Sequence, residues 1–265
     1  HVLRAAAVCP THLVLCCLSV QQVEVKSGVE SVLLPWRRGD QLVSRRSTAS
    51  LPADVRVVWR DDRGRKVHVH QNGSDQPGEQ DQFYRTRTRM DENLVENKNL
   101  SLTLRWPTDR DKNIYVCKVY NRDRVLMEKK VQLEVSDQQV EVEEGEESVK
   151  LEFKVTFDLQ GGDRVEWQDS RGRKVHVYQI GSDQPVEQAQ FYRTRTRMNE
   201  DALETKDLSL TLDRPTEKDI SQFRCGVYRK GDLLGIKSTQ LNLKAKKSLV
   251  QPKDIRMPLL ADQSV

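Results

Sequence analysis

Hydrophobic and polar residues alternate with a period of two in five short stretches of the first half of the chain: 55–60, 66–70, 100–104, 115–120 and 131–135. Successive side chains of a strand point to opposite faces, so this period predicts strands with one buried side and one solvent-facing side. Turn signals such as Asn72 with Gly73 fall between the stretches, and no convincing amphipathic helix appears. Short strands at this density predict an all-β fold built from β-sandwiches.

The second half of the chain repeats the first. The octapeptide FYRTRTRM occupies residues 83–90 and again 191–198, an offset of 108 residues. Other residues recur at the same offset: Trp59 as Trp167, Cys117 as Cys225, and Pro107 as Pro215. A period of this size is that of a whole domain, because solenoid repeats have periods of roughly 20–50 residues.

The repeat predicts two tandem domains with a segment at each end. We expect a signal-like segment at 1–20, one domain at 21–136, a second at 137–245 and a polar tail at 246–265. The starts of the two copies match at an offset of 117 residues, so the first copy holds nine extra residues before Trp59. They fall in the polar, basic and aperiodic stretch 36–50, which is typical of an enlarged loop.

Composition excludes several classes of protein. The hydrophobic fraction of 36% suits thin two-sheet cores better than a large α/β enzyme. The net charge of +4 arises from 44 basic and 40 acidic residues, which indicates a mixed surface and gives no reason to expect nucleic-acid binding. The sequence shows no phosphate loop, nucleophile elbow or acid pair on a helix, so we expect neither an enzyme nor a cofactor or small-molecule substrate.

The first twenty residues resemble a secretory signal, with Arg4 before an apolar run; a disordered leader or a remnant of the gene model is the alternative. The run is shorter than the roughly 20 residues that span a bilayer. We therefore expect an extracellular or cell-surface protein, secreted unless an anchor lies outside the given sequence. The start at His1 leaves the completeness of the chain open. The sequons at Asn72 and Asn99, absent from the second copy, agree with secretion.

The pattern from Trp59 through the LSLTL run to the Asp-x-x-x-Tyr-x-Cys segment ending at Cys117 resembles the immunoglobulin variable-type domain. Together the two copies extend this resemblance over nearly all of residues 22–244. The arginine–threonine run followed by NLSLTL or DLSLTL is most similar to butyrophilin-like and T-cell costimulatory ligand domains, especially of fish. The resemblance implies a core signature of Trp59, Tyr115 and Cys117, with Trp167, Phe223 and Cys225 in the second copy.

The same resemblance gives a role to the repeated octapeptide. It implies a strand in which one arginine pairs with the aspartate that opens the Tyr-x-Cys turn. We assign Arg87 to Asp111 and Arg195 to Asp219. The remaining arginines are interpreted as an exposed basic strand that keeps a sheet edge soluble.

The disulfide of the family cannot form, because both copies lack the second-strand cysteine. Alignment puts Trp36 and Phe153 at its position. A lost bridge of this loop length forgoes roughly 4 kcal/mol, of which a buried aromatic residue recovers about 2–3 kcal/mol. We therefore expect Cys117 and Cys225 to be buried thiols. Cys9, Cys16 and Cys17 lie in the signal-like segment.

Two further motifs favour the simpler interpretation. The triplet from Arg38 to Asp40 is an integrin-type tripeptide, but such triplets also arise by chance, and we favour chance over adhesion. His68 and His70 have a spacing that could bind a metal, but the second copy has Tyr178 in place of His70. We interpret them as exposed strand histidines.

Function in such a sandwich is expected on the outward face of one sheet. If Trp59 points inward, alternation predicts a protein-binding face of Arg56, Val58, Arg60, Lys66, His68, Lys118 and Tyr120. The resemblance implies a butyrophilin-like ligand that binds a protein receptor on lymphocytes or other cells and modulates T-cell receptor signalling and cytokine production. An adhesion or decoy module and an intracellular structural pair of immunoglobulin-like domains stay open, as do the receptor, the sign of the signal and the oligomeric state.

Overall fold

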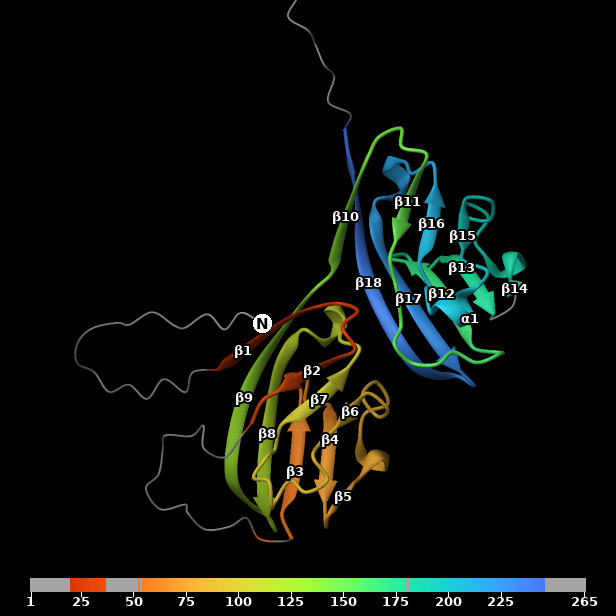
Figure 1. Cartoon of the computed structure of the whole chain (residues 1–265). Helices are drawn as coiled ribbons and strands as arrows, with labels where there is room; N and C mark the ends of the chain where they lie inside the picture. Colours follow the sequence, from red (N-terminus) through yellow and green to blue (C-terminus); the bar gives the residue numbers. More distant parts are fainter. Residues whose placement is uncertain (1–19, 37–51, 53, 180–181, 246–265) are drawn as a thin grey trace, which may run out of the picture. The chain divides into compact units, whose positions relative to one another are not determined.

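The computed structural model describes residues 20–36, 52, 54–179 and 182–245 (Figure 1). The chain divides into two compact units between Asp137 and Gln138, with Gly226–Ser238 grouped with the first. Strands β1–β9 form one sandwich and strands β10–β18 form another, and each sandwich is described by itself. The expectation of an all-β fold with two immunoglobulin-like sandwiches is confirmed. The signal-like segment, most of the enlarged loop with Arg38 and Asp40, and the tail lie outside the described residues.

The first sandwich packs a three-stranded sheet against a six-stranded sheet (Figure 1). The larger sheet has the order β1-β9-β8-β3-β4-β5, and the smaller has the order β2-β7-β6. Within the described residues the sandwich thus has nine strands. A variable-type sandwich has nine strands and a constant-type sandwich has seven, the two additional strands lying in one sheet. The strands are β1 (Gln21–Lys26), β2 (Ser31–Leu34), β3 (Arg56–Arg60), β4 (Lys66–Gln71), β5 (Ser74–Asp75), β6 (Thr88–Arg89), β7 (Leu102–Arg105), β8 (Asn113–Asn121) and β9 (Arg124–Ser136).

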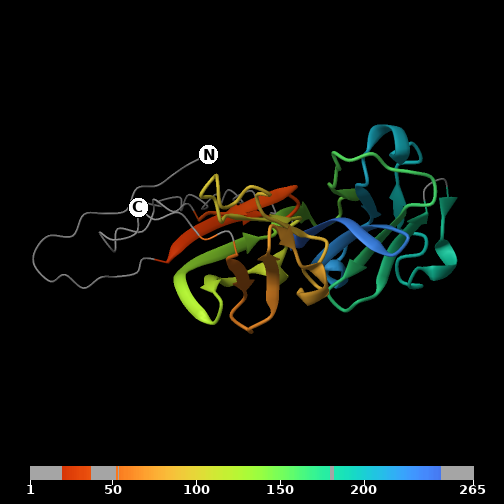
Figure 2. The same ribbon diagram turned by 90° about the horizontal axis from the view of Figure 1, so that it is seen from below.

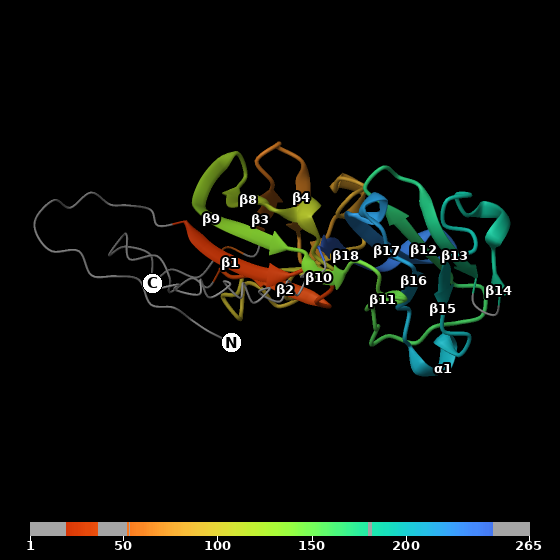
Figure 3. The same ribbon diagram turned by 90° about the horizontal axis from the view of Figure 1, so that it is seen from above.

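Strand β1 closes one edge of the larger sheet. It runs parallel to β9, with Gln21 opposite Val131 and Lys26 opposite Ser136 (Figure 2 and Figure 3). At the other edge, β4 and β5 are joined by Asn72 and Gly73, which both have positive φ angles of 53° and 74°. Two such residues make the tight turn whose twist matches that of the flanking strands, which explains the Asn-Gly pair at this position.

The core of the first sandwich is built on Trp59. Its indole is fully buried and donates a hydrogen bond from Nε1 to the carbonyl oxygen of Leu100 at 3.2 Å. Cys117 lies opposite Trp59 on β8, is also fully buried and is a free thiol. Trp36 is fully buried and packs edge-on against Trp59. An aromatic ring therefore lies in the core at the position that alignment assigns to the missing cysteine.

The corner before β8 is held by a buried ion pair. Arg87 Nη2 lies 2.6 Å from Asp111 Oδ2, and Arg87 also donates to the carbonyl oxygen of Trp106. Asp111 closes a short 3₁₀ helix (Asp109–Asp111) and accepts a further hydrogen bond from the amide of Thr108. The hydroxyl of Tyr115 donates to the carbonyl oxygen of Asp111 at 2.7 Å. The arginine therefore fixes the turn from which the tyrosine and cysteine strand begins.

The strand expected at the octapeptide is wrong for most of its length. Residues 83–87 form turns, and only Thr88 and Arg89 belong to β6. The alternation misleads here because Phe83 and Arg87 interact with each other. The Arg87 guanidinium carbon lies 4.9 Å from the centre of the Phe83 ring, and that of Arg65 lies 5.1 Å away. Stacking on this ring requires a compact turn rather than an extended strand.

The second sandwich repeats this plan, with the orders β10-β18-β17-β12-β13-β14 and β11-β16-β15. Arg195 Nη2 lies 2.7 Å from Asp219 Oδ2, and Trp167, Phe223 and Cys225 are fully buried. Phe223 has no hydroxyl to repeat the Tyr115 contact. The elements are β10 (Gln138–Glu143), β11 (Ser148–Leu151), β12 (Arg164–Asp169), β13 (Lys174–Gln179), β14 (Ser182–Asp183), β15 (Thr196–Met198), α1 (Ala202–Thr205), β16 (Leu210–Asp213), β17 (Ser221–Arg229) and β18 (Asp232–Lys244).

Candidate protein-binding face

The outward face of the larger sheet of the first sandwich brings together residues from three strands. Across β3 and β8, Arg56 lies opposite Tyr120, Val58 opposite Lys118 and Arg60 opposite Val116. Across β3 and β4, Arg60 lies opposite Lys66. Residues directly opposite each other in an antiparallel pair share a face, so six of the seven expected residues lie on one side of the sheet. The seventh, His68, does not.

The assignment of His68 to this face is wrong. His68 lies opposite Trp59, on the inner side of the sheet, and is 1% exposed. A β-bulge between Trp59 and Arg60 inserts one residue into β4, so Lys66 and His68 point to opposite faces although they are two positions apart. His68 bonds to Thr88 Oγ1 through Nδ1 at 3.0 Å and to Asp75 Oδ1 through Nε2 at 2.9 Å. It therefore belongs to the interior of the sandwich, and His70, 5% exposed, is also not an exposed strand histidine.

Val58 is also not available for contact. It lies on the outward side but is only 3% exposed, because it sits in the middle of the sheet between Val69 and Lys118. Longer neighbouring side chains cover a short residue in such a position. In the second copy Glu166 takes its place.

The face is less basic than the sequence indicates, because acidic residues pair with most of its cations. Glu79 Oε2 lies 2.6 Å from Arg56 Nη2 and 2.7 Å from Lys66 Nζ. The hydrogen bond from Arg56, and next that from Lys66, lowers the pKa of Glu79 to about 2. Lys118 Nζ lies 3.1 Å from Glu128 Oε2. Arg60 donates to the carbonyl oxygen of Gly64 at 2.8 Å and has no carboxylate partner among the described residues.

Two apolar residues that sequence reasoning missed extend this face at the tip of the hairpin between β8 and β9. Val125 lies opposite Tyr120 and is 44% exposed. Leu126, 40% exposed, sits where the register shifts between Val119 and Tyr120. Exposed apolar side chains beside a tyrosine are typical of the centre of a protein-binding surface. The alternation that predicts this strand covers only residues 131–135 and does not reach Val125 and Leu126. The one signal for them in the sequence is their position just after the turn at 121–124.

The matching face of the second sandwich differs in chemistry. Gln168, Gly226 and Tyr228 stand at the positions of Arg60, Lys118 and Tyr120. A Cβ atom at Gly226 would lie 2.7 Å from the hydroxyl of Tyr228, so the hydroxyl end of the tyrosine ring covers the glycine. Glu187 again pairs with two cations, at 2.5 Å from Arg164 and 2.8 Å from Lys174.

The two sequons differ in accessibility. Asn72 is exposed at its hairpin turn. Asn99 is half-buried, its Oδ1 accepts a hydrogen bond from the Ser101 amide at 3.3 Å, and Ser101 is itself buried. The folded domain therefore presents Asn72 more openly than Asn99.

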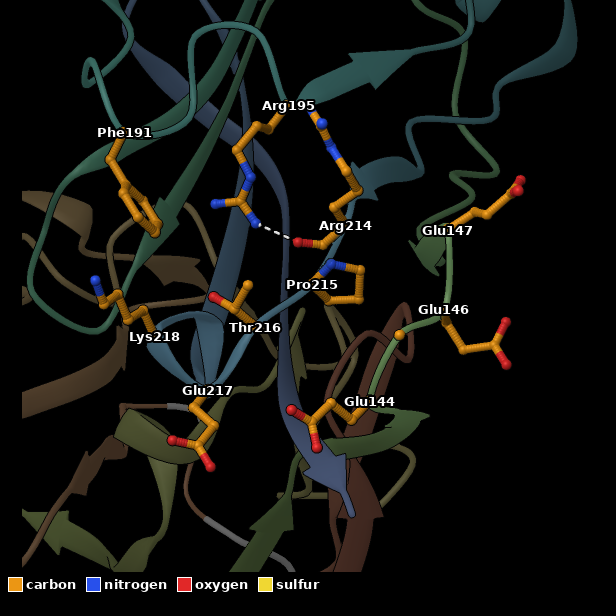
Figure 4. A pocket seen from close by; sticks show the side chains of 11 residues that line it. Glu144, Glu146, Glu147, Phe191, Arg195, Arg214, Pro215, Thr216, Glu217 and Lys218 are labelled. Atoms are coloured by element: carbon orange, nitrogen blue, oxygen red, sulfur yellow. Dashed lines mark hydrogen bonds between the residues drawn. The ribbon is translucent and has the colours of Figure 1, made fainter. Parts of the chain in front are cut away.

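A cleft of about 860 Å³ lies in the second sandwich (Figure 4). Glutamates 144, 146, 147 and 217 line it together with Phe191, Arg195, Arg214 and Lys218. Arg195 forms an ion pair with Asp219. It also donates to the carbonyl oxygen of Arg214 (Figure 4). The lining includes no histidine, serine or cysteine, and within the described part of the chain no group of acidic, histidine or cysteine side chains is arranged to hold a metal ion. None of the described helices has the length and apolar character to cross a membrane.

No protein-family model matches the sequence. A search of curated proteins also finds no match. Among solved structures, the chain is similar to the human B7-H4 IgV-like domain, with 20% identity, 40% of this chain and 91% of that chain covered, and a TM-score of 0.36. It is similar to bovine butyrophilin, with 15% identity, coverage of 84% and 95%, and a TM-score of 0.37. It is also similar to a chain in the crystal structure of ICOS in complex with ICOS-L and an anti ICOS-L VNAR domain, with 14% identity, coverage of 83% and 99%, and a TM-score of 0.38. The strand order of the two sandwiches, rather than these similarities, identifies the fold as immunoglobulin variable-type.

Proposed function

We propose that the chain is a non-catalytic, cell-surface or secreted protein-binding module, and that the outward face of its first sandwich is the binding surface. The observation that supports this most directly is the chemistry of Arg60, Tyr120 and Val125 along this face, where Tyr120 lies opposite Arg56 at the other end of β3 from Arg60. It combines a cation without a carboxylate partner, a tyrosine and an exposed apolar residue on one sheet. Tyrosine and arginine are enriched among residues that carry binding energy. A flat surface of this kind fits a protein rather than a small molecule.

The domains that we propose are 21–136 and 137–245, with the second serving chiefly as a spacer. The partner that we propose is a receptor on lymphocytes, bound by a butyrophilin-like ligand that modulates T-cell signalling. The family resemblance of the sequence supports this partner.

The test uses fluorescent tetramers of the whole chain on lymphocytes, read by flow cytometry. We expect the double variant Arg60→Glu, Tyr120→Ala to lose at least tenfold in staining while its circular dichroism stays that of the parent. The matched control is Gln168→Glu, Tyr228→Ala in the second sandwich, which should stain normally. Undiminished staining by the folded first variant would show that the binding surface lies elsewhere.

The cysteines favour a second candidate function. Cys117 and Cys225 form no disulfide, as is usual in a reducing compartment, which supports an intracellular structural pair of domains. Mass spectrometry of the protein from animal cells separates the two candidates. A glycan on Asn72 or Asn99 would exclude the intracellular function, and unmodified peptides from both sites would favour it.

A further inference from the structure

A small pocket of about 250 Å³ opens in the first sandwich between the turn after β4 and the segment 92–96. It is smaller than the sites of about 300–1,000 Å³ that hold drug-sized ligands, so its size suits a single side chain. The pocket is lined by Val55, His70, Gly73, Glu92, Asn93, Leu94, Val95 and Glu96. It lies away from the outward face of the sheet, because His70 is opposite the inward-facing Val57.

His70 lines this pocket with a buried imidazole ring. Its side chain is 6% exposed, and its Nδ1 lies 2.8 Å from Asp75 Oδ1. Burial raises the pKa of Asp75, but the hydrogen bonds from His68 and His70 lower it by more in sum, so the carboxylate is ionised and can only accept. Nδ1 of His70 must then carry the proton, and in the neutral ring the lone pair is on Nε2. No hydrogen bond joins that nitrogen to another described residue.

The rest of the lining offers acceptors and an apolar wall, and it contains no lysine or arginine. Glu92 and Glu96 are exposed at the rim. Glu92 is 3.2 Å from Arg89, but both side chains are more than 70% exposed, so this ion pair holds Glu92 weakly. Val55, Leu94 and Val95 form the apolar wall of the pocket.

The second sandwich has lost this arrangement through two compensating substitutions. Tyr178 replaces His70, and Ala202 replaces the larger Leu94. The Tyr178 hydroxyl donates to the carbonyl oxygen of Glu200 at 3.1 Å, which occupies its polar end. Glu200 and Glu204 correspond to Glu92 and Glu96, so the acidic rim is kept while the acceptor nitrogen is absent.

We propose that the pocket at His70 binds one arginine side chain of a partner protein. The His70 Nε2 lone pair and the two rim carboxylates accept from the guanidinium, and the apolar wall packs along its methylene stem. Arginine fits better than lysine, because its planar group presents five donors in a fixed geometry to acceptors on several sides. The proposal is separate from the face around Arg60, and either can fail without the other.

The test is an NMR titration of the whole ¹⁵N-labelled chain with N-acetyl-arginine methylamide, read at the His70 ring nitrogens. The control probe is N-acetyl-citrulline methylamide, which has nearly the same shape and no charge. We expect a saturable shift of His70 Nε2 with the arginine probe and at least tenfold weaker binding of the citrulline probe. Equal affinity for both probes, or no saturable shift at His70 with the arginine probe, would overturn the proposal.

Two variants separate the pocket from a general charge effect. His70→Tyr with Leu94→Ala copies the residues of the second sandwich. It should abolish the probe-induced chemical-shift changes of the backbone amides in segment 92–96. Glu92→Gln with Glu96→Gln leaves His70 and Leu94 in place and removes only the two rim charges. This variant should weaken binding at least tenfold. The matched control, Glu200→Gln with Glu204→Gln, should bind as the parent does. If the control loses as much affinity as the rim variant, the probe responds to overall charge and the pocket is not the site.

Discussion

The rings of Trp36 and Trp59 meet edge to face, with their centroids 6.4 Å apart and an interplanar angle of 85°. This is a favourable geometry for two aromatic rings, because the positive edge of one meets the negative face of the other. Trp36 is where alignment places the missing disulfide cysteine, and both indoles are fully buried. The contact thus ties the segment that follows β2 to the centre of the core without a covalent bond.

Replacing Trp36 with alanine should therefore destabilise the first sandwich strongly. We expect the free energy of unfolding to fall by about 3–5 kcal/mol, as for other buried aromatic residues truncated to alanine. Urea unfolding followed by far-ultraviolet circular dichroism measures this. Leu33→Ala is the control, since Leu33 is 50% exposed and should change stability by less than about 0.5 kcal/mol. Similar midpoints for the two variants would show that Trp36 does not replace the bridge.

The arginines of the octapeptide should contribute unequally to stability. Arg87 is 7% exposed and pairs with the fully buried Asp111, so Arg87→Ala leaves a buried carboxylate without its partner and should cost about 3 kcal/mol. Arg195, 16% exposed, should show the same effect at a smaller size. Arg85→Ala and Arg193→Ala are the controls, because both side chains are exposed. Equal urea midpoints for all four variants would contradict the structural role of the pair.

The two domain cysteines should react only after unfolding. Burial raises the pKa of the Cys117 thiol well above its ordinary value, and both Cys117 and Cys225 are fully buried and form no disulfide. The thiolate is the reactive form, so the native chain from residue 21 onward should react negligibly with a disulfide reagent at pH 8. In denaturant the same chain should titrate two thiols. A count of zero in denaturant would reveal a bridge between them.

Sequence pattern was enough to predict the sandwich fold, because alternation and the Trp59 and Cys117 spacing reflect burial directly. It was not enough where the backbone breaks its own period. The bulge after Trp59 reverses the facing of His68 relative to Lys66, and no residue type marks that bulge. The octapeptide alternates like a strand but folds into turns, since Phe83 stacks with Arg65 and Arg87.

Contacts between residues distant in sequence were the other limit. Glu79 is 23 residues from Arg56 and 13 from Lys66, and nothing local in the sequence shows that it pairs with both. Likewise, the pocket at His70 depends on segment 92–96, which folds against it from another part of the chain. A face can therefore be drawn from alternation, but its charge balance needs the tertiary structure.

Acid should weaken the first sandwich in part through Glu79. Its pKa in the folded chain is lowered to about 2, from an ordinary 4.5, by hydrogen bonds from Arg56 and Lys66. A group whose folded pKa is depressed stabilises the fold above its unfolded pKa and loses that contribution as pH falls through the folded value. The stability difference between the parent and Glu79→Gln should thus be present above about pH 5 and vanish near pH 2. Because the interaction of Glu79 with Arg56 and Lys66 is exposed, 1 M salt should reduce this stability difference. A difference that is constant from pH 7 to pH 2 would exclude this assignment.

The last prediction concerns which cation of the outward face guides a partner. Lys118 is already paired with Glu128 at 3.1 Å, whereas Arg60 has no carboxylate partner among the described residues. A charge that is compensated within the molecule contributes little to long-range attraction, which mainly sets the association rate. We therefore expect Arg60→Glu to slow association with the lymphocyte receptor more than Lys118→Glu, and Glu128→Gln to speed it by freeing Lys118. Once a receptor has been captured with the tetramers, surface plasmon resonance at 50 and 300 mM salt measures the three rates. The association rate of each of the three variants should differ less from that of the parent at the higher salt concentration, where charges more than a few ångströms apart are screened. If Lys118→Glu slows association as much as Arg60→Glu does, the pairing with Glu128 does not neutralise Lys118, and the face is a uniformly basic surface after all.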